Sequence, residues 1–214
     1  GDDILIPGIM EHVERAGVHS GDSIAVYPAW NISDEMTETI VNASRNLALS
    51  LQTKGLVNIQ YLIYHNELYV IEVNPRASRS VPFLSKSTNI NLVNIATKVM
   101  LGRSLKEQGY NNITIPEKDR WYVKAPAFSF EKLTGMDAYL SPEMKSTGEV
   151  LGIGRTKAEA LYKGLAASGI DVAEIKKKPN RGILISVEDY DYTDAVSLAE
   201  KFTDLGIKIY ATPD

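Results

Sequence analysis

The feature that most constrains the fold is a pair of runs in which apolar and polar residues alternate, "LVNIQYLIY" at 56–64 and "ELYVIEVN" at 67–74. A period of two is typical of β-strands, and the two residues between the runs, His65 and Asn66, form a plausible turn. The pattern therefore predicts a β-hairpin over 56–74.

One face of this hairpin is predicted to carry oxygen ligands. Around a turn near 65–66, Gln60 and Glu72 lie almost opposite each other, and Asn74 shares the face of Glu72 because it is two residues away. Mg²⁺ prefers such oxygens, with phosphates and water completing its shell. Arg76 and Arg79 follow the strand and can bind phosphoryl oxygens through forked hydrogen bonds. A metal and phosphate platform is one interpretation, and a solvated sheet face with weak surface ion pairs is the other.

Composition narrows the class of protein. Of the 214 residues, 44% are apolar and 23% are charged, which is typical of a globular chain. The net charge of −4 argues against a partner that is nucleic acid or an acidic membrane. We find no apolar run of about 20 residues and no signal peptide. The absence of cysteine excludes thiolate metal sites and fits a cytoplasmic protein. The chain opens without Met and closes just after a strand-like run, so we expect a fragment.

Before the hairpin, the spacing of apolar residues predicts a helix over 7–16 that Gly17 ends, and alternation predicts a strand within 22–30. Ser33 is suited to cap a second helix, which runs to a stop signal at 54–55. The segment "AGVHSGDS" at 16–23 places small residues around His19, so its backbone N–H groups are able to approach a ligand. A helix end followed by a polar turn is the alternative reading.

After the hairpin, we expect a helix over 89–101 and a polar surface connection over 103–120. The run "WYVKAPAFSF" reads as a strand that Pro126 interrupts, hence an edge or bulged strand. "GEVLGIGRTKAEALYKGLAASG" reads as strand, glycine turn and helix, with Thr156 and Glu159 as a capping box. "GIGRT" lacks the third glycine and the Gly-Lys-Ser/Thr of phosphate loops. "KKKPNRG" at 176–182 reads as a linker, and a parallel β-α-β unit follows, with a strand at 183–187, a helix at 193–205 and a strand at 207–211.

Taken in order, "AGVHSGDS", "NIQ", "IEVNPRASRSVPFLSK" and "STGEVLGIGRT" resemble the carbamoyl-phosphate synthetase large subunit family. The resemblance covers nearly the whole chain and implies the second of two homologous synthetase halves, which phosphorylates carbamate with ATP. It implies an α/β fold: a partial C-terminal lobe of an ATP-grasp unit with a mostly antiparallel sheet (1–105), a connecting part of the synthetic unit (106–174), and the start of a Rossmann-like parallel domain similar to methylglyoxal synthase (175–214).

The resemblance also implies roles for single residues. Gln60, Glu72 and Asn74 would hold the Mg²⁺ or Mn²⁺ ions, two per ATP site, that bridge the ATP phosphates. The nucleotide site would include Gln60 and Glu72 and be lined by Gly17, Val18, His19 and Ser20. Arg76 and Arg79 would bind carbamate or the transferring phosphoryl group. K⁺ is a further candidate ion.

The family implies partners and regulation beyond this site. A small glutamine-amidotransferase subunit would supply ammonia for carbamoyl phosphate, which feeds arginine and pyrimidine biosynthesis. Glu14 and Asp22 match two acidic residues of an ornithine activator site, but Ala125 stands at the third, which favours pyrimidine-type control. Ser186 and Thr212 match positions that contact a UMP-like effector, whereas Tyr192 replaces a lysine.

The sequence leaves two rival functions open. One is another ATP-grasp ligase, such as a carboxylase or a purine-pathway enzyme, and the other is a stand-alone effector-binding module. An ATP-grasp site closes between two lobes, and the lobe with the lysines and the adenine pocket would precede Gly1. We therefore expect this chain alone to be inactive and to bind ATP weakly.

Overall fold

A computed structural model of the chain describes residues 3–116, 119–129, 139–170, 182–187 and 191–212. The chain divides into two compact units, Gly1–Gly169 and Ile170–Asp214. Within the described ranges, no helix combines the length and the apolar character that a membrane span requires.

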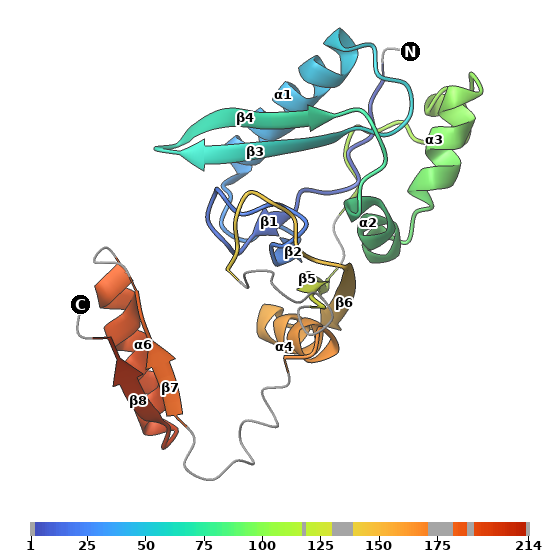
Figure 1. Cartoon of the computed structure of the whole chain (residues 1–214). Helices are drawn as coiled ribbons and strands as arrows, with labels where there is room; N and C mark the ends of the chain where they lie inside the picture. The colour runs from blue at the N-terminus through green and yellow to red at the C-terminus, as the bar shows by residue number, and fades with distance from the viewer. Residues whose placement is uncertain (1–2, 117–118, 130–138, 171–181, 188–190, 213–214) are drawn as a thin grey trace. The chain divides into compact units, whose positions relative to one another are not determined.

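A four-stranded antiparallel sheet organises the first unit (Figure 1). Its strands, in spatial order, are β1 (Glu11–His12), β2 (Ala25–Tyr27), β5 (Trp121–Ala127) and β6 (Gly148–Gly154). Helix α4 (Lys157–Ala167) packs on β5 and β6. Val26, Val123 and Ala160 are buried together where these elements meet, and Trp30 and Trp121 pack against them.

Glycines on β6 allow this close packing of α4. A Cβ atom added at Gly152 would overlap the carbonyl oxygen of Ala160, and one added at Gly154 would lie 2.5 Å from the backbone nitrogen of Ala160. The "GIG" of the sequence motif therefore brings strand and helix backbones together. Half of the predicted capping box is present, because the backbone N–H of Glu159 donates to the Thr156 hydroxyl at 3.1 Å. The Glu159 carboxylate accepts from the backbone N–H of Arg155 at 2.7 Å, one residue before the position that the box requires.

The predicted hairpin is confirmed as β3 (Asn58–Tyr64) and β4 (Glu67–Asn74), an antiparallel pair. His65 and Asn66 form its turn with positive φ angles of 48° and 61°. Helix α1 (Asp34–Ser50) lies beside the hairpin (Figure 1), and the Ser44 and Tyr61 hydroxyls share a hydrogen bond of 2.9 Å. The predicted cap is also confirmed, since Ser33 Oγ accepts from the Met36 N–H.

Two short helices follow the hairpin, where the sequence predicted one. Helix α2 (Ser80–Thr88) ends at Asn89, which has a left-handed φ of 61°, and α3 (Leu92–Met100) begins after its own cap, Asn91. The predicted helix over 89–101 was therefore right from 92 onward, and α2 was missed. Phe83 of α2 is buried against Tyr27 and Tyr122, so tertiary contacts support this short helix. The connection that follows contains a 3-10 turn, η1 (Lys106–Gln108).

The helix predicted over 7–16 is wrong. Glu11 and His12 form strand β1, paired with Val26 and Ala25 of β2. The Glu11 carboxylate accepts from the backbone N–H groups of Trp30 and Asn31. These distant backbone partners favour an extended conformation that the apolar spacing could not indicate.

The prediction that "WYVKAPAFSF" forms an edge or bulged strand is also wrong, because β5 pairs in regular register with β2 on one side and with β6 on the other. The ladder to β2 covers Tyr122 to Lys124 only. Pro126 lies past its end, opposite Glu149 of β6, so the missing N–H costs no hydrogen bond to β2.

The second unit is a parallel β-α-β motif: β7 (Gly182–Ile185), α6 (Tyr192–Asp204) and β8 (Lys208–Ala211). The predicted strand, helix and strand are confirmed within two residues at each end. Most of the predicted linker, 176–181, lies outside the described residues. The chain therefore has the predicted α/β class, with an antiparallel part followed by a parallel part.

Candidate active site

The hairpin brings Gln60 and Glu72 together. They are directly paired across the strands, and Asn58 pairs with Asn74 at the next position of the same face. The opposite face carries Tyr61, which bonds to α1 through Ser44. The oxygen-bearing face is therefore the one turned away from α1.

A β-bulge creates this arrangement. From the turn to Tyr61, which pairs with Val70, the ladder is regular, but Gln60 then pairs with Glu72 and leaves Ile71 as the extra residue. Without the bulge, Gln60 would pair with Ile71, and Glu72 would point to the opposite face, since a slip of one residue reverses a strand's faces. The bulge thus places the Glu72 side chain on the same face of the hairpin as Gln60.

The oxygens of Gln60, Glu72 and Asn74 fit a hard divalent cation that takes most of its ligands from phosphates and water. Among the described residues, the side chains of Gln60, Glu72 and Asn74 make no hydrogen bond or ion pair that would compete for their oxygens. No group of three or more His, Cys, Asp or Glu side chains in the described part of the chain could hold a metal. One carboxylate and two amides suit Mg²⁺ or Mn²⁺ that is shared with phosphates and water.

The two predicted arginines have different surroundings. Arg76 is exposed, and its Nη1 donates to the Ala77 carbonyl at 3.0 Å. Arg79 stands at the start of α2 and is partly buried. Its Nη1 donates to Ser146 Oγ at 2.9 Å, so a residue 67 positions away holds its guanidinium. Arg79 is therefore the fixed cation and Arg76 the adaptable one.

The loop at 17–22 lies on the other side of Ser146. Gly17 has a φ of 107°, a conformation that favours glycine. The N–H of His19 already donates to the Ser141 carbonyl, so it is not available to a ligand. His19 Nδ1 accepts from the Gly21 N–H at 3.0 Å, which places the proton of the neutral ring on Nε2. His19 therefore offers a side-chain donor.

Asp22 anchors this loop from within the protein. It is fully buried, and its carboxylate accepts from the backbone N–H groups of Lys145 at 2.7 Å and Ser146 at 2.8 Å. Burial by itself would raise the pKa of Asp22, but these hydrogen bonds outweigh burial and lower the pKa below its usual value. The ionised carboxylate is thus structural.

A buried lysine joins the loop to the sheet. Lys124 of β5 is 4% exposed, and its Nζ donates to the Ser20 carbonyl at 2.8 Å. Burial lowers the pKa of Lys124, while the charges of Glu149 and Glu14 act in the opposite direction. Burial raises the pKa of both carboxyls. Ala125, also fully buried, presents no polar group here.

Sequence reasoning missed Ser146 and Lys124. Ser146 belongs to the quoted motif "STGEVLGIGRT" but had no assigned partner. The position of Lys124 within the apolar run "WYVKAPAF" could have indicated a buried lysine with a polar partner, because lysine is rarely buried without one.

In the second unit, Ser186 and Thr212 follow the carboxyl ends of the two parallel strands. The Thr212 hydroxyl donates to Ser186 Oγ at 3.3 Å, so the structure brings these two predicted effector residues together. Tyr192 begins α6. Ligands commonly bind at this end of parallel sheets.

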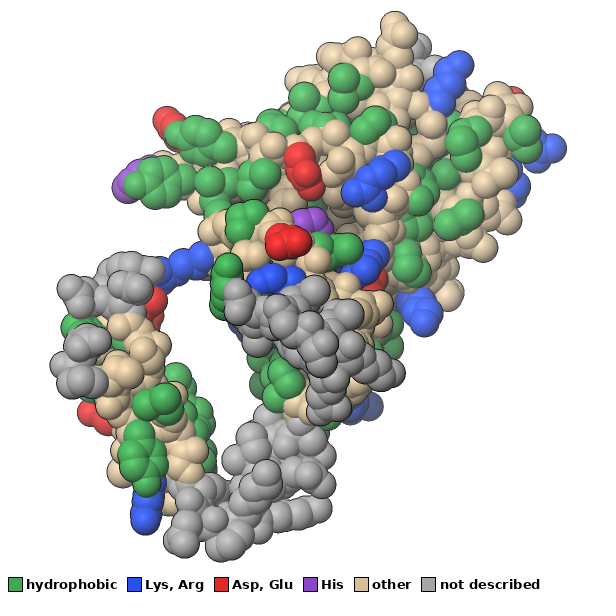
Figure 2. All heavy atoms as spheres, in the orientation of Figure 1, with side chains coloured by type: hydrophobic (Ala, Val, Ile, Leu, Met, Phe, Trp, Pro, Cys, Tyr) green, Lys and Arg blue, Asp and Glu red, His purple; other side chains and the backbone are tan. Residues whose placement is uncertain are grey.

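The wider surface is mixed in character. Figure 2 shows acidic, basic and apolar side chains interspersed on the face that it draws.

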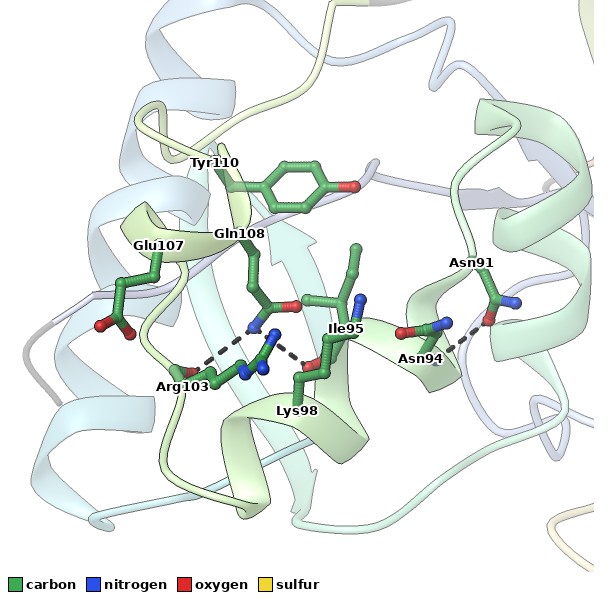
Figure 3. Close-up of a pocket in the computed structure, with 8 residues that line it drawn as sticks. All are labelled: Asn91, Asn94, Ile95, Lys98, Arg103, Glu107, Gln108 and Tyr110. Atoms are coloured by element: carbon green, nitrogen blue, oxygen red, sulfur yellow. Dashed lines mark hydrogen bonds between the residues drawn. The ribbon is translucent and has the colours of Figure 1, made fainter.

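A polar depression of about 440 Å³ lies between α3 and residues 103–110 (Figure 3). Lys98, Arg103 and the Gln108 amide are among its lining residues, and none of the predicted site residues is.

Comparisons with known proteins identify the family. Residues 2–108, half of the chain, match the family model of the carbamoyl-phosphate synthase L chain, ATP binding domain. The chain is 52% identical over 212 residues to the carbamoyl phosphate synthase large chain of Lachnoclostridium phytofermentans, and this match covers 99% of the chain and 19% of that relative. The chain thus spans about a fifth of the relative's length.

Solved structures share the fold. N5-carboxyaminoimidazole ribonucleotide synthetase from Thermus thermophilus superposes with a TM-score of 0.51 at 16% identity, over 74% of this chain and 44% of that one. A single-chain, multi-domain long-chain acyl-CoA carboxylase gives a TM-score of 0.57 at 16% identity, over 76% of this chain and 20% of that one. These likenesses show an ATP-grasp fold. The chain belongs to the carbamoyl-phosphate synthase large chain family.

Proposed function

We propose that this chain is part of the unit that transfers the γ-phosphoryl group of ATP to carbamate, yielding carbamoyl phosphate and ADP. The family match supports ligase chemistry that uses ATP. The observation that carries the proposal further is the pairing of Gln60 with Glu72 on the open face of the hairpin, with Arg79 fixed beyond its end. Phosphoryl transfer needs positioning and charge neutralisation more than acid–base chemistry, and these residues supply both.

Gln60, Glu72 and Asn74 would hold the divalent ions, Mg²⁺ or Mn²⁺, two per ATP site. When bound, such ions neutralise charge on the phosphates. K⁺ remains a further candidate for which we assign no residues.

The remaining site residues act on the substrates directly. Arg79, held by Ser146, presents a cation in a fixed place to carbamate or the moving phosphoryl group. Arg76, being exposed, can adapt to the substrate. Gly17, Val18, His19 and Ser20 would line the nucleotide site, with His19 Nε2 as a donor.

The longer protein would need further substrates and partners. We expect a cytoplasmic, glutamine-dependent enzyme that receives ammonia from a small amidotransferase subunit and serves arginine and pyrimidine biosynthesis. The contact between Ser186 and Thr212 supports a nucleotide effector site in the second unit.

The test uses the full-length large chain with Glu72→Gln, which removes one charge at nearly constant shape. The step is assayed in reverse, as ATP formed from ADP and carbamoyl phosphate. We expect a loss of at least about 100-fold, the scale of other electrostatic contributions to catalysis. Glu67→Gln, at the other end of β4, is the matched control and should keep the activity. An unchanged rate in Glu72→Gln would remove Glu72 from the site.

A further inference from the structure

Ser146 lies at the centre of a buried hydrogen-bond network. It is 5% exposed, and its Oγ accepts from Arg79 Nη1 at 2.9 Å while donating to the Gly21 carbonyl at 3.0 Å. Its backbone N–H donates to Asp22 Oδ1 at 2.8 Å. One residue therefore contacts both the arginine after the hairpin and the loop at 17–22.

Asp22 makes this connection stiff. Its two carboxylate oxygens hold consecutive N–H groups, those of Lys145 and Ser146, and its own N–H donates to the His19 carbonyl at 2.9 Å. Hydrogen bonds to an ionised acceptor are stronger than neutral ones. Ser146 is therefore fixed relative to the loop, and it cannot shift without breaking bonds on both sides.

The contact leaves Arg79 able to bind an anion. Its Nη1 and Nη2 also lie 3.5 Å and 3.4 Å from the Ser146 carbonyl, so one edge of the guanidinium faces Ser146. Within the described residues, its Nε–H has no hydrogen-bond partner. A guanidinium has five N–H donors, so donors remain for a ligand.

We propose that Ser146 is a positioning residue for phosphoryl transfer. It holds the guanidinium of Arg79 at a fixed place relative to the loop at 17–22, so that the arginine and the residues that line the nucleotide site address the same phosphoryl group. This inference rests on the proposed function, and it assigns to Ser146 no contact with substrate.

The experiment uses the full-length large chain and the reverse assay with ADP and carbamoyl phosphate. Ser146→Ala removes the hydroxyl. Thr147→Ala is the matched control, because the neighbouring hydroxyl bonds to Ala127 and Ser129, and the hydrogen bonds of Arg79 go to Ser146 instead. We expect Ser146→Ala to lower kcat/KM for carbamoyl phosphate by about 10- to 100-fold, the cost of a misplaced catalytic group. The KM for ADP should stay within about twofold, since nucleotide contacts persist. Thr147→Ala should match the parent.

A second variant and a second readout separate positioning from folding. Ser146→Cys nearly keeps the volume and replaces the hydroxyl by a weak hydrogen-bonding thiol. It should fold and show the same selective loss, which decides the case if Ser146→Ala does not fold. In a crystal structure of either variant, the Arg79 guanidinium should leave its place beside residue 146.

Each outcome has a distinct meaning. A variant with parental kinetics, with equal losses for ADP and carbamoyl phosphate, or with Arg79 unmoved would overturn the positioning role. Arg79→Ala is measured alongside. If Arg79→Ala retains full activity, Arg79 has no role in phosphoryl transfer and the proposed function fails at that residue. If Arg79→Ala loses activity but the Ser146 variants do not, only the positioning role of Ser146 fails.

Discussion

His12 shows how strongly the neighbourhood of a single side chain sets its chemistry. It lies on β1, close enough to buried Lys124 for the two charges to interact. Burial lowers the pKa of His12 from 6.5 to about 4, and the positive charge of Lys124 acts in the same direction. His12 is therefore neutral in the folded protein at physiological pH and is no general acid for the proposed reaction.

This lowered pKa makes the folded chain less stable in mild acid. Between pH 6.5 and about pH 4, an unfolded chain binds a proton at His12 that the folded chain does not bind, so the free energy of unfolding falls as the pH falls. The full loss is at most about 3.4 kcal/mol. Asp22 acts in a separate window, since its lowered pKa means that its contribution disappears only as the pH falls below 3.8 and through the folded value.

We predict that NMR will show the lowered pKa of His12 directly. The chain has three histidines, and in a pH titration of their ring signals His12 should stay neutral until about pH 4. Replacing His12 by Gln should identify its signal and flatten the pH dependence of unfolding between pH 4 and 6.5. A His12 midpoint near the ordinary value of about 6.5 would contradict the burial argument.

At the scale of elements, the packing of α4 on β6 depends on the absence of side chains. We predict that Gly152→Ala will lower the free energy of unfolding by at least about 2 kcal/mol, because the new Cβ would meet backbone atoms of Ala160 and Gly164. Denaturant unfolding measures this. Gly148→Ala on the same strand is the control, since its Cβ would lie 3.9 Å from Ala127 Cβ and should change stability by no more than about 0.5 kcal/mol. Equal effects would mean that the helix can move away from the strand.

The elements that sequence could predict are those whose signals are local. The turn at His65 and Asn66 and the Ser33 cap depend on neighbouring residues, and both are present. The helix expected over 7–16 failed because Glu11 bonds to backbone groups 19 and 20 residues away. No local pattern contains such partners.

In the candidate site, too, sequence could predict the local features but not the long-range contacts. Alternation indicated that Gln60 and Glu72 were close to opposite, but only the bulge at Ile71 puts them on one face. The arginines were evident from the motif, whereas the bond from Arg79 to Ser146 spans 67 positions and became visible only in the fold. Spacing along a strand can therefore predict a set of ligands, and long-range hydrogen bonds decide how rigidly they are held.

At the scale of the whole molecule, the chain contains two compact units and spans about a fifth of its relative. The hairpin face that would meet the phosphates is open, and Glu72 is exposed. Sites for ligands of nucleotide size usually bury about 70–90% or more of the ligand surface. Groups on an open face supply charge to the phosphates, but they exclude little water and leave the nucleotide solvated.

We therefore predict that the 214-residue chain binds ATP weakly and forms no carbamoyl phosphate, whereas the full-length large chain binds ATP well and forms carbamoyl phosphate. In calorimetric titrations with ATP and Mg²⁺, the chain should show a Kd of about 1 mM or weaker, or no measurable heat. Residual binding that disappears in Glu72→Gln would locate it at the hairpin. A Kd of about 10 μM or tighter, abolished by the same substitution, would instead mean that the hairpin, the arginines and the loop at 17–22 suffice to hold the nucleotide. Enclosure of the nucleotide would then not be needed for affinity, because charge alone would have supplied it.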